Sequence, residues 1–219
     1  MLSVRTLSEN VHTWQREITA MNYRATVVAL SVVVAGCATA VNPLDDYEEL
    51  DATTILDAPT PGAGNVAPQN RESVARGEYL VELLGCGVCH TDGALIGEPR
   101  SDRSLAGSRV GIAYTNPLEF RYPGVAYPPN ITPDEDTGIG SWSNRQIANA
   151  IRSGIGRHGT QPITVMPWQA FAKLTDADVN AIVGYLRHID PVKHRVPENT
   201  PPGRRSKAPY VHFGVYRPR

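Results

Sequence analysis

Two cysteines and a histidine carry the clearest chemical signal in the sequence. Cys86 and Cys89 are separated by two residues in the stretch LLGCGVCHTDG, and His90 follows directly. Thiol and imidazole side chains exchange disulfides, bind metals and form covalent links to cofactors. Three kinds of site therefore fit this trio: a redox dithiol, half of a zinc site, or a place where a prosthetic group is permanently attached.

The surrounding sequence favours permanent attachment. A thioredoxin-like dithiol is expected within a β-α-β pattern, and no strand-like alternation flanks residues 80–95. A structural zinc site needs four ligands, and the chain has no second C-x-x-C pair or H-x-H cluster. Two cysteines at this spacing reach both vinyl groups of one haem, and the adjacent histidine then ligates the iron. We expect one covalent haem c, held by Cys86 and Cys89, with His90 as axial ligand.

The opposite axial position is expected to be filled by Met166. This methionine lies in QPITVMPWQAF, between Pro162 and Pro167, and prolines at these positions disfavour a regular helix and favour a stiff loop. His158 is the main competing ligand. Iron held by His and Met has no vacant position, so the chain is expected to carry electrons and not to catalyse a reaction. The alternative is a haem enzyme or gas sensor in which the methionine is displaced.

The N-terminal region predicts export and lipid attachment. The apolar run of residues 25–37, ATVVALSVVVAGC, is too short to cross a bilayer but has the length of a secretory signal core. Its end, VAGC, resembles the bacterial lipobox, so residues 1–36 are expected to be a signal peptide and Cys37 a lipidated N-terminus. Met21 is a better start than Met1, because Glu9 and Glu17 do not suit a signal. The protein is expected on the periplasmic side of a bacterial membrane.

Two segments that flank the central region have opposite charge. The net charge of the whole chain is only −1, which gives no indication of nucleic-acid binding. Residues 37–70 contain six acidic residues and no Lys or Arg, and we expect a flexible tether with a typical span of about 30 Å and a full reach of about 110 Å. Residues 191–219 are proline-rich and contain seven Lys or Arg against Glu198 alone. This extension is either a solvated strap over the domain or a docking arm for an acidic partner or anionic headgroups.

Helical patterns occur on both sides of the haem motif. Apolar residues recur at helical spacing between residues 72 and 84. Ser143 with Gln146, and Thr175 with Asp178, have the spacing of N-terminal capping boxes before two further helices. Gly154 is expected to end the first of these helices. Residues 97–129 show no helical period, and we expect them to form a loop over one haem edge or a partner-binding surface.

Taken together, these motifs resemble the class I c-type cytochromes. The CGVCH motif and Met166 are accompanied by NITPDEDTGIGSW at residues 130–142, MPW at 166–168 and LTDADVNAIVGYLR at 174–187. This combination is similar to the cytochrome subunits of bacterial periplasmic dehydrogenases, over about residues 72–190. The resemblance implies an all-α domain at residues 71–190 that wraps one haem. It also implies a crossing of the first and last helices at Gly77 and Tyr185.

The resemblance also bears on partners and on the haem pocket. A carrier of this kind would exchange electrons with a dehydrogenase, a quinol-oxidising complex or a terminal oxidase. Subunits of this family often hold several haems, whereas this chain has a single C-x-x-C-H motif. Four residues are candidates for hydrogen bonds to the haem propionates, with ordinary turn and aromatic packing as the alternative: Tyr127, Asn130, Trp142 and Trp168.

Overall fold

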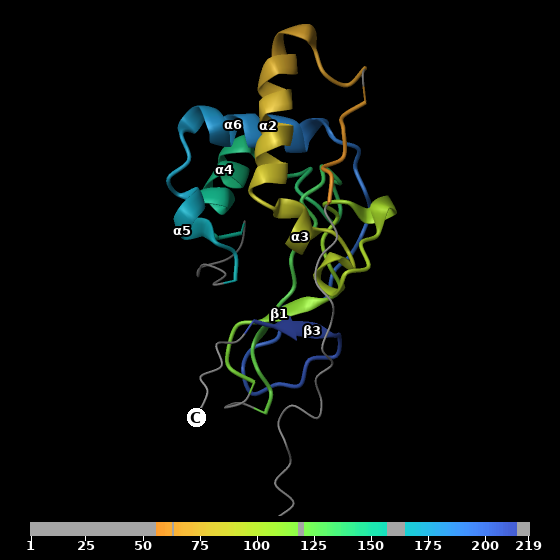
Figure 1. Cartoon of the computed structure of the whole chain (residues 1–219), viewed down its shortest axis with the longest axis vertical. Coiled ribbons are helices and arrows are strands. Elements are labelled where there is room, and N and C mark those ends of the chain that lie inside the picture. The colour runs from red at the N-terminus through yellow and green to blue at the C-terminus, as the bar shows by residue number, and fades with distance from the viewer. Residues whose placement is uncertain (1–55, 63, 118–120, 157–164, 214–219) are drawn as a thin grey trace, which may run out of the picture. The chain divides into compact units, whose positions relative to one another are not determined.

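The computed structural model of the chain describes residues 56–62, 64–117, 121–156 and 165–213. Within these ranges the structure has five α-helices, three short 3₁₀ helices and one small sheet (Figure 1). The helices are α2 (Arg71–Leu83), α3 (Cys86–His90), α4 (Asn144–Ser153), α5 (Trp168–Phe171) and α6 (Asp176–His188). The 3₁₀ helices are Pro68–Asn70, Ala94–Ile96 and Ser101–Arg103, and the strands are β1 (Gly111–Ala113), β2 (Val125–Ala126) and β3 (Tyr210–His212).

The predicted helix ends are confirmed by their hydrogen bonds. At the start of α4, Ser143 Oγ accepts from the Gln146 amide (3.2 Å), and Gln146 Oε1 accepts from the Ser143 amide (2.8 Å). These reciprocal bonds satisfy amides that the helix itself leaves unpaired. The helix ends at Gly154, whose φ of +68° is disfavoured for other residues. At the start of α6, Thr175 Oγ1 accepts from the Asp178 amide (3.1 Å).

The crossing of α2 and α6 depends on a glycine, as expected. A Cβ atom placed on Gly77 would lie 2.1 Å from the carbonyl oxygen of Ala181 and 2.7 Å from Cβ of Tyr185. The two backbones therefore approach more closely than any side chain at position 77 would permit. Figure 1 shows α2 and α6 crossing at a steep angle.

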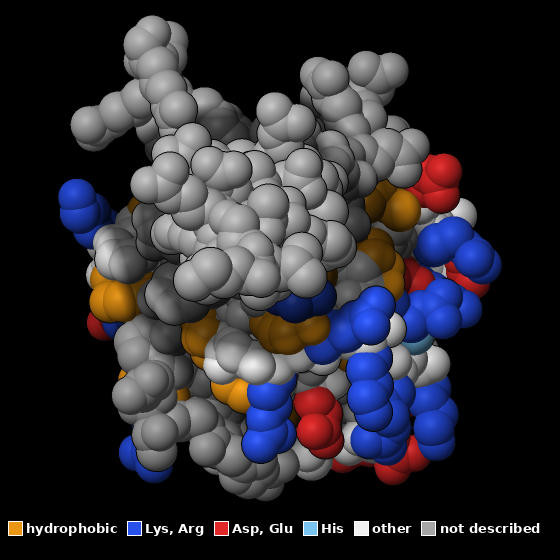
Figure 2. Space-filling model, turned by 90° about the horizontal axis from the view of Figure 1, so that it is seen from below, with side chains coloured by type: hydrophobic (Ala, Val, Ile, Leu, Met, Phe, Trp, Pro, Cys, Tyr) orange, Lys and Arg blue, Asp and Glu red, His pale blue; other side chains and the backbone are white. Residues whose placement is uncertain are grey.

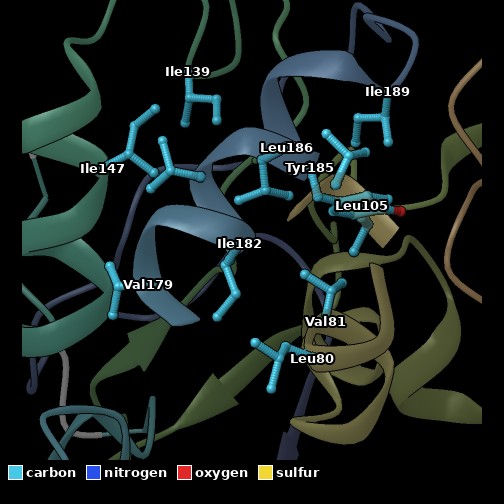
Figure 3. Close-up of a cluster of buried hydrophobic side chains, with 12 residues drawn as sticks. Leu80, Val81, Leu105, Ile139, Ile147, Val179, Ile182, Tyr185, Leu186 and Ile189 are labelled. Atoms are coloured by element: carbon cyan, nitrogen blue, oxygen red, sulfur yellow. The ribbon is translucent and has the colours of Figure 1, made fainter. Parts of the chain in front are cut away.

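The hydrophobic core fills the space between α2, α4 and α6. Figure 3 shows side chains of α6 directed toward those of α2 and α4, with Leu105 and Ile139 contributed by the intervening loops. Tyr185 is completely buried in this cluster. The buried members are Val74, Leu80, Val81, Leu105, Ile139, Ile147, Val179, Ile182, Val183, Tyr185, Leu186 and Ile189.

The segment that precedes α2 is fastened to the domain. The Tyr185 hydroxyl donates to the Pro59 carbonyl (2.7 Å), Glu82 Oε1 accepts from the Ala58 amide (3.0 Å), and Glu78 Oε1 accepts from the Thr60 hydroxyl (2.9 Å). Residues 58–60 therefore contact the domain, while the expected boundary at residue 71 stays a prediction. Sequence composition indicated a linker here because acidic and proline-rich stretches usually remain solvated.

A three-stranded sheet departs from the expected all-α architecture. Its order is β2-β1-β3, with β1 antiparallel to β2 (Ile112 opposite Ala126) and parallel to β3 (Ile112 opposite Val211). Two of these strands belong to residues 97–129, which were expected to form a loop. Strands of two or three residues are too short to show the alternation that identifies a strand in a sequence.

Residues 191–213 run along the domain, and we call them the C-terminal strap; the docking-arm alternative for this extension stays a prediction. Val125 and Thr200 exchange backbone hydrogen bonds of 2.8 Å, and the Asn199 side chain accepts from the Tyr127 amide (2.8 Å). His194 is buried, and its Nδ1 lies 3.0 Å from the Ala106 carbonyl oxygen.

Among the residues that the structure describes, no helix has the length and apolar character needed to cross a membrane.

Candidate haem site

Helix α3 carries both cysteines and the histidine on a single turn. It begins after Gly85, whose φ of +67° reverses the chain at the end of α2. Because residues three apart lie on one face of a helix, Cys86 and Cys89 project to the same side. Both thiols are free and partly buried. This arrangement suits two bonds to one edge of one ligand.

The electrostatic environment of the thiols does not suit a redox dithiol. Burial, reinforced by the neighbouring Cys89, raises the pKa of Cys86 to about 11, and burial also raises the pKa of Cys89. Reactive dithiols require the opposite, a pKa lowered toward neutrality by nearby positive charge. The described residues also give no support for a zinc site. Among them, no three or more His, Cys, Asp or Glu side chains are arranged to hold a metal ion.

His90 is oriented by a backbone carbonyl. Its Nδ1 lies 2.7 Å from the carbonyl oxygen of Pro129, so Nδ1–H donates and Nε2 keeps its lone pair. Burial lowers the pKa of His90 although the Pro129 carbonyl opposes that shift, and the neutral imidazole is the form that binds metals. A histidine held in this way has a fixed ring plane and a fixed tautomer, as a metal ligand requires.

Asn130 fixes the loop that presents the Pro129 carbonyl. Its Nδ2 donates to Val192 O (2.7 Å) and to Thr137 Oγ1 (3.0 Å), and its Oδ1 accepts from the amide and the hydroxyl of Thr132 (2.9 and 2.7 Å). The amide is thus fully engaged with protein groups. The propionate contact predicted for Asn130 stays a prediction. Here the side chain fixes the loop in which the preceding residue, Pro129, accepts from His90.

Tyr127 is also engaged elsewhere. Its hydroxyl contacts Ser206 Oγ (2.5 Å) and donates to the Ala208 carbonyl (3.0 Å), both in the C-terminal strap. The propionate contact predicted for Tyr127 also stays a prediction. The observed contacts of Tyr127 and Asn130 are of the kind that the alternative, turn and aromatic packing, predicts.

Trp168 is the candidate that retains an unsatisfied donor. Its indole Nε1 is buried and has no hydrogen-bond partner among the described residues. The ring lies against the end of α4, since a Cβ on Gly154 would be 2.5 Å from Trp168 Cδ1. A buried N–H without a partner is costly unless something satisfies it, and a haem carboxylate is such a group. The half-buried Trp142 packs on the core cluster, and its predicted propionate contact stays a prediction.

Met166 immediately precedes α5. It is half-buried, and its carbonyl oxygen accepts from the Trp168 amide (2.8 Å), which closes a tight turn through Pro167. The described contacts do not join Met166 to His90, so the axial pair stays a prediction. His158, the competing ligand, lies outside the described residues, as does Cys37.

A buried ion cluster next to the motif was missed at the sequence level. The Asp92 carboxylate accepts from the Arg109 amide (2.9 Å), from Arg109 Nε (3.3 Å) and from Arg103 Nη1 (2.7 Å). Burial opposes ionisation of Asp92, but these donors hold its pKa below the usual value. The cluster ties the chain after His90 to residues 103–109. Two arginines in an irregular segment give no signal that they meet one aspartate.

Comparison with known proteins places this site in a family. Residues 74–190 match the family model described as Cytochrome c. The chain is 35% identical over 145 residues to the fructose dehydrogenase cytochrome subunit of Gluconobacter japonicus. The aligned region covers 66% of this chain and 26% of that protein. It is 34% identical over 146 residues to the cytochrome c subunit of the quinone alcohol dehydrogenase of Gluconobacter oxydans. That alignment covers 66% of this chain and 27% of the relative.

A third relative is the gluconate 2-dehydrogenase cytochrome c subunit of Pantoea cypripedii, 34% identical over 119 residues, or 54% of this chain and 24% of that protein. The matched region thus spans about a quarter of the length of these relatives. The recognised resemblance to cytochrome subunits of bacterial dehydrogenases is confirmed. With a C-x-x-C-H turn, an oriented histidine and a family match over more than half of its residues, the chain belongs to the cytochrome c family.

Proposed function

We propose that this protein transfers electrons through a single haem c bonded to Cys86 and Cys89, with His90 and Met166 as axial ligands. The observation that carries the proposal is the 2.7 Å contact between His90 Nδ1 and Pro129 O, on the same turn that presents both cysteines. This contact leaves Nε2 as the ring nitrogen available to iron. When bound, the haem supplies a one-electron couple.

The residues of the chain would hold the haem, orient its ligand and set its reduction potential. Cys86 and Cys89 hold the group permanently, and the Pro129 carbonyl holds the His90 ring in one plane. A Met166 thioether on the other side would favour ferrous iron and raise the reduction potential. Two protein ligands would also exclude small molecules from the iron. Trp168 Nε1, which lacks a partner among the described residues, would satisfy a propionate.

The partner is proposed to be a dehydrogenase. The relatives are named as cytochrome subunits of fructose, alcohol and gluconate dehydrogenases, which supports a donor that oxidises a sugar, an alcohol or a related acid. A quinol-oxidising complex is the alternative donor, and the acceptor would be a terminal oxidase. The single C-x-x-C-H motif supports a relay with one haem, without an internal chain of haems.

The axial assignment is tested by spectroscopy on matched variants. Met166→Ala is expected to lose the sulfur-to-iron charge-transfer band, to lower the reduction potential and to bind carbon monoxide when reduced. His158→Ala, the control at the competing position, is expected to leave all three properties unchanged. A wild-type protein without the sulfur-to-iron band, in which His158→Ala and not Met166→Ala lets carbon monoxide bind, would assign the ligand to His158. Carbon monoxide binding by the wild-type protein would instead favour a haem enzyme or sensor. A haem peptide without the added porphyrin mass would exclude covalent attachment.

Membrane attachment through Cys37 is a separate part of the proposal. The sequence VAGC at the end of an apolar run supports it. Lipidation would keep the domain close to membrane enzymes and raise its local concentration there. Cys37→Ser is expected to remain unprocessed or to leave the detergent fraction, whereas unchanged partition with an intact mature N-terminus would contradict lipidation.

A further inference from the structure

The segment from Leu105 to Gly107 joins the haem turn to the loop that orients His90. The Leu105 amide donates to Thr91 Oγ1 (3.2 Å), and the Leu105 carbonyl oxygen accepts from the Ile131 amide (2.9 Å). The Gly107 amide donates to the carbonyl oxygen of His90 (2.7 Å). We call these three residues the bridging segment. It is bonded both to the backbone of the histidine and to the loop that carries the acceptor of the Nδ1 proton.

Gly107 lies directly against the peptide group that orients His90. A Cβ atom at this position would be 2.6 Å from the Asn130 amide nitrogen and 2.8 Å from the Pro129 carbonyl carbon. The carbonyl oxygen of that same peptide lies 2.7 Å from His90 Nδ1. The φ of Gly107, +85°, is also disfavoured for residues that have a side chain. Only glycine therefore permits both the backbone conformation and the close approach at this position.

Leu105 has a strained backbone conformation. Its φ is +58°, and in the described part of the chain it is the only non-glycine residue with a positive φ. Such a conformation persists only where the surrounding structure maintains it, and it is concentrated at functional sites. The Leu105 side chain is 1% exposed and belongs to the core cluster between α2, α4 and α6. The hydrophobic core thus fixes one end of the bridging segment.

The C-terminal strap holds the middle of the bridging segment. His194 of the strap is buried, and its Nδ1–H donates to the carbonyl oxygen of Ala106 (3.0 Å). The His194 amide donates to Thr137 Oγ1 (3.1 Å), which also accepts from Asn130 Nδ2 (3.0 Å). One strap residue is therefore bonded to the bridging segment and to the network that fixes the Pro129 carbonyl.

We propose that Gly107 positions the iron ligand His90 by setting the place of the Pro129 carbonyl, and that His194 holds the bridging segment there. The identity of His90 as the ligand rests on the proposed function. A hydrogen bond from Nδ1 to a carbonyl oxygen makes an imidazole a stronger electron donor to a metal and fixes its ring plane. A stronger donor favours ferric iron, so this bond lowers the reduction potential. Displacing the carbonyl should therefore weaken the bond and raise the potential.

Two matched glycine substitutions test this role. Gly107→Ala and Gly203→Ala place alanine at a φ of +85° and +84°, but no atom lies within 4 Å of the Cβ position at Gly203. We expect only Gly107→Ala to raise the reduction potential and to speed exchange of the His90 Nδ1 proton by about tenfold. NMR of the isotope-labelled ferrous protein measures the exchange. An equal effect in both variants, or no effect in Gly107→Ala, would overturn the proposal.

A change of charge near the haem would also move the potential, so electrostatic effects need their own control. The two glycine substitutions alter no charge, and the Lys and Arg side chains that Figure 2 shows gathered mainly on one side of the view are the same in both variants. His194, in contrast, has its Nε2 3.7 Å from the Asp92 carboxylate. A potential shift in a His194 variant therefore supports positioning only where the exchange of the His90 proton changes with it.

Replacements of His194 test the part played by the strap, and they are informative even where Gly107→Ala does not fold. His194→Leu removes the donor to Ala106, so the potential should rise and the His90 Nδ1 proton should exchange faster. His194→Asn can place its amide nitrogen near the position of Nδ1, so it should return both values toward those of the wild type. A potential shift in His194→Leu without faster exchange, or no recovery in His194→Asn, would overturn the proposal. Failure of the proposed function would show separately, as His90 ring protons in the ferrous wild-type protein without the large ring-current shift of a haem ligand.

Discussion

The carbonyl oxygen of Pro129 lies 2.7 Å from Nδ1 of His90, and Asn130 holds it there through bonds to Thr132, Thr137 and the strap residue Val192. The orientation of the proposed iron ligand therefore depends on an amide that reaches three other parts of the chain. Asn130 is a positioning residue, and its effect on the haem passes through the backbone.

Asn130→Ala is expected to destabilise the protein and to disturb the iron. Loss of the amide leaves buried donors and acceptors unpaired, at a cost of about 2–4 kcal/mol in the free energy of unfolding. A looser Pro129 carbonyl should also shift the reduction potential, which a purely structural change far from His90 would leave unaltered. Urea unfolding and redox titration measure the two effects. Asn180→Ala, on the exposed side of α6, is the control and should change neither.

Gly77→Ala is expected to be severely destabilising. The added methyl group would overlap the Ala181 carbonyl, so α2 and α6 must separate and the core between them must loosen. The expected loss is about 3 kcal/mol or more. Gly184→Ala is the matched control, because nothing lies within 4 Å of the Cβ position on that helix residue. It should be neutral or raise stability by about 0.5–1 kcal/mol. Equal effects of the two changes in urea unfolding would contradict the close crossing.

Tyr185→Phe is expected to release the segment before α2. The ring remains in the core while its bond to the Pro59 carbonyl is lost, at a cost of about 1 kcal/mol. Hydrogen exchange at Ala58, whose amide bonds to Glu82, should become faster. Tyr79→Phe, on an exposed face of α2, should leave that exchange rate unchanged. If the Ala58 amide stays equally protected in both variants, the Tyr185 bond does not hold this segment.

The Asp178 carboxylate is expected to stabilise the fold in a way that is lost in acid. Its bonds with Thr175 and with Arg76, on the facing helix, hold its pKa below the ordinary value of an aspartate carboxyl group. A depressed folded-state pKa means that the unfolded chain binds the proton more readily, so this stabilisation is complete above pH 3.8 and is lost as pH falls through the folded-state pKa. The stability difference between wild type and Asp178→Asn should shrink in that window. Identical acid profiles for wild type and Asp178→Asn would refute the assignment.

The local sequence was sufficient for features that depend on short spacings. The Ser143 capping box and the end of α4 at Gly154 were predicted correctly, because each is determined by residues within one or two helical turns. The Gly77–Tyr185 crossing was also correct, but it came from the family resemblance and not from periodicity. Met166 and Cys37 were assigned by sequence alone and stay predictions.

Tertiary structure alone decided which distant segments meet. Nothing local indicates that residues 210–212 add a strand beside residues 111–113, or that the strap supplies hydrogen-bond partners to Tyr127 and Asn130. Buried polar groups take whatever partner the fold brings within reach, and that choice involves residues more than 60 positions apart. The sequence determined the chemistry of the haem turn, while long-range pairing determined which side chains remain free to serve it.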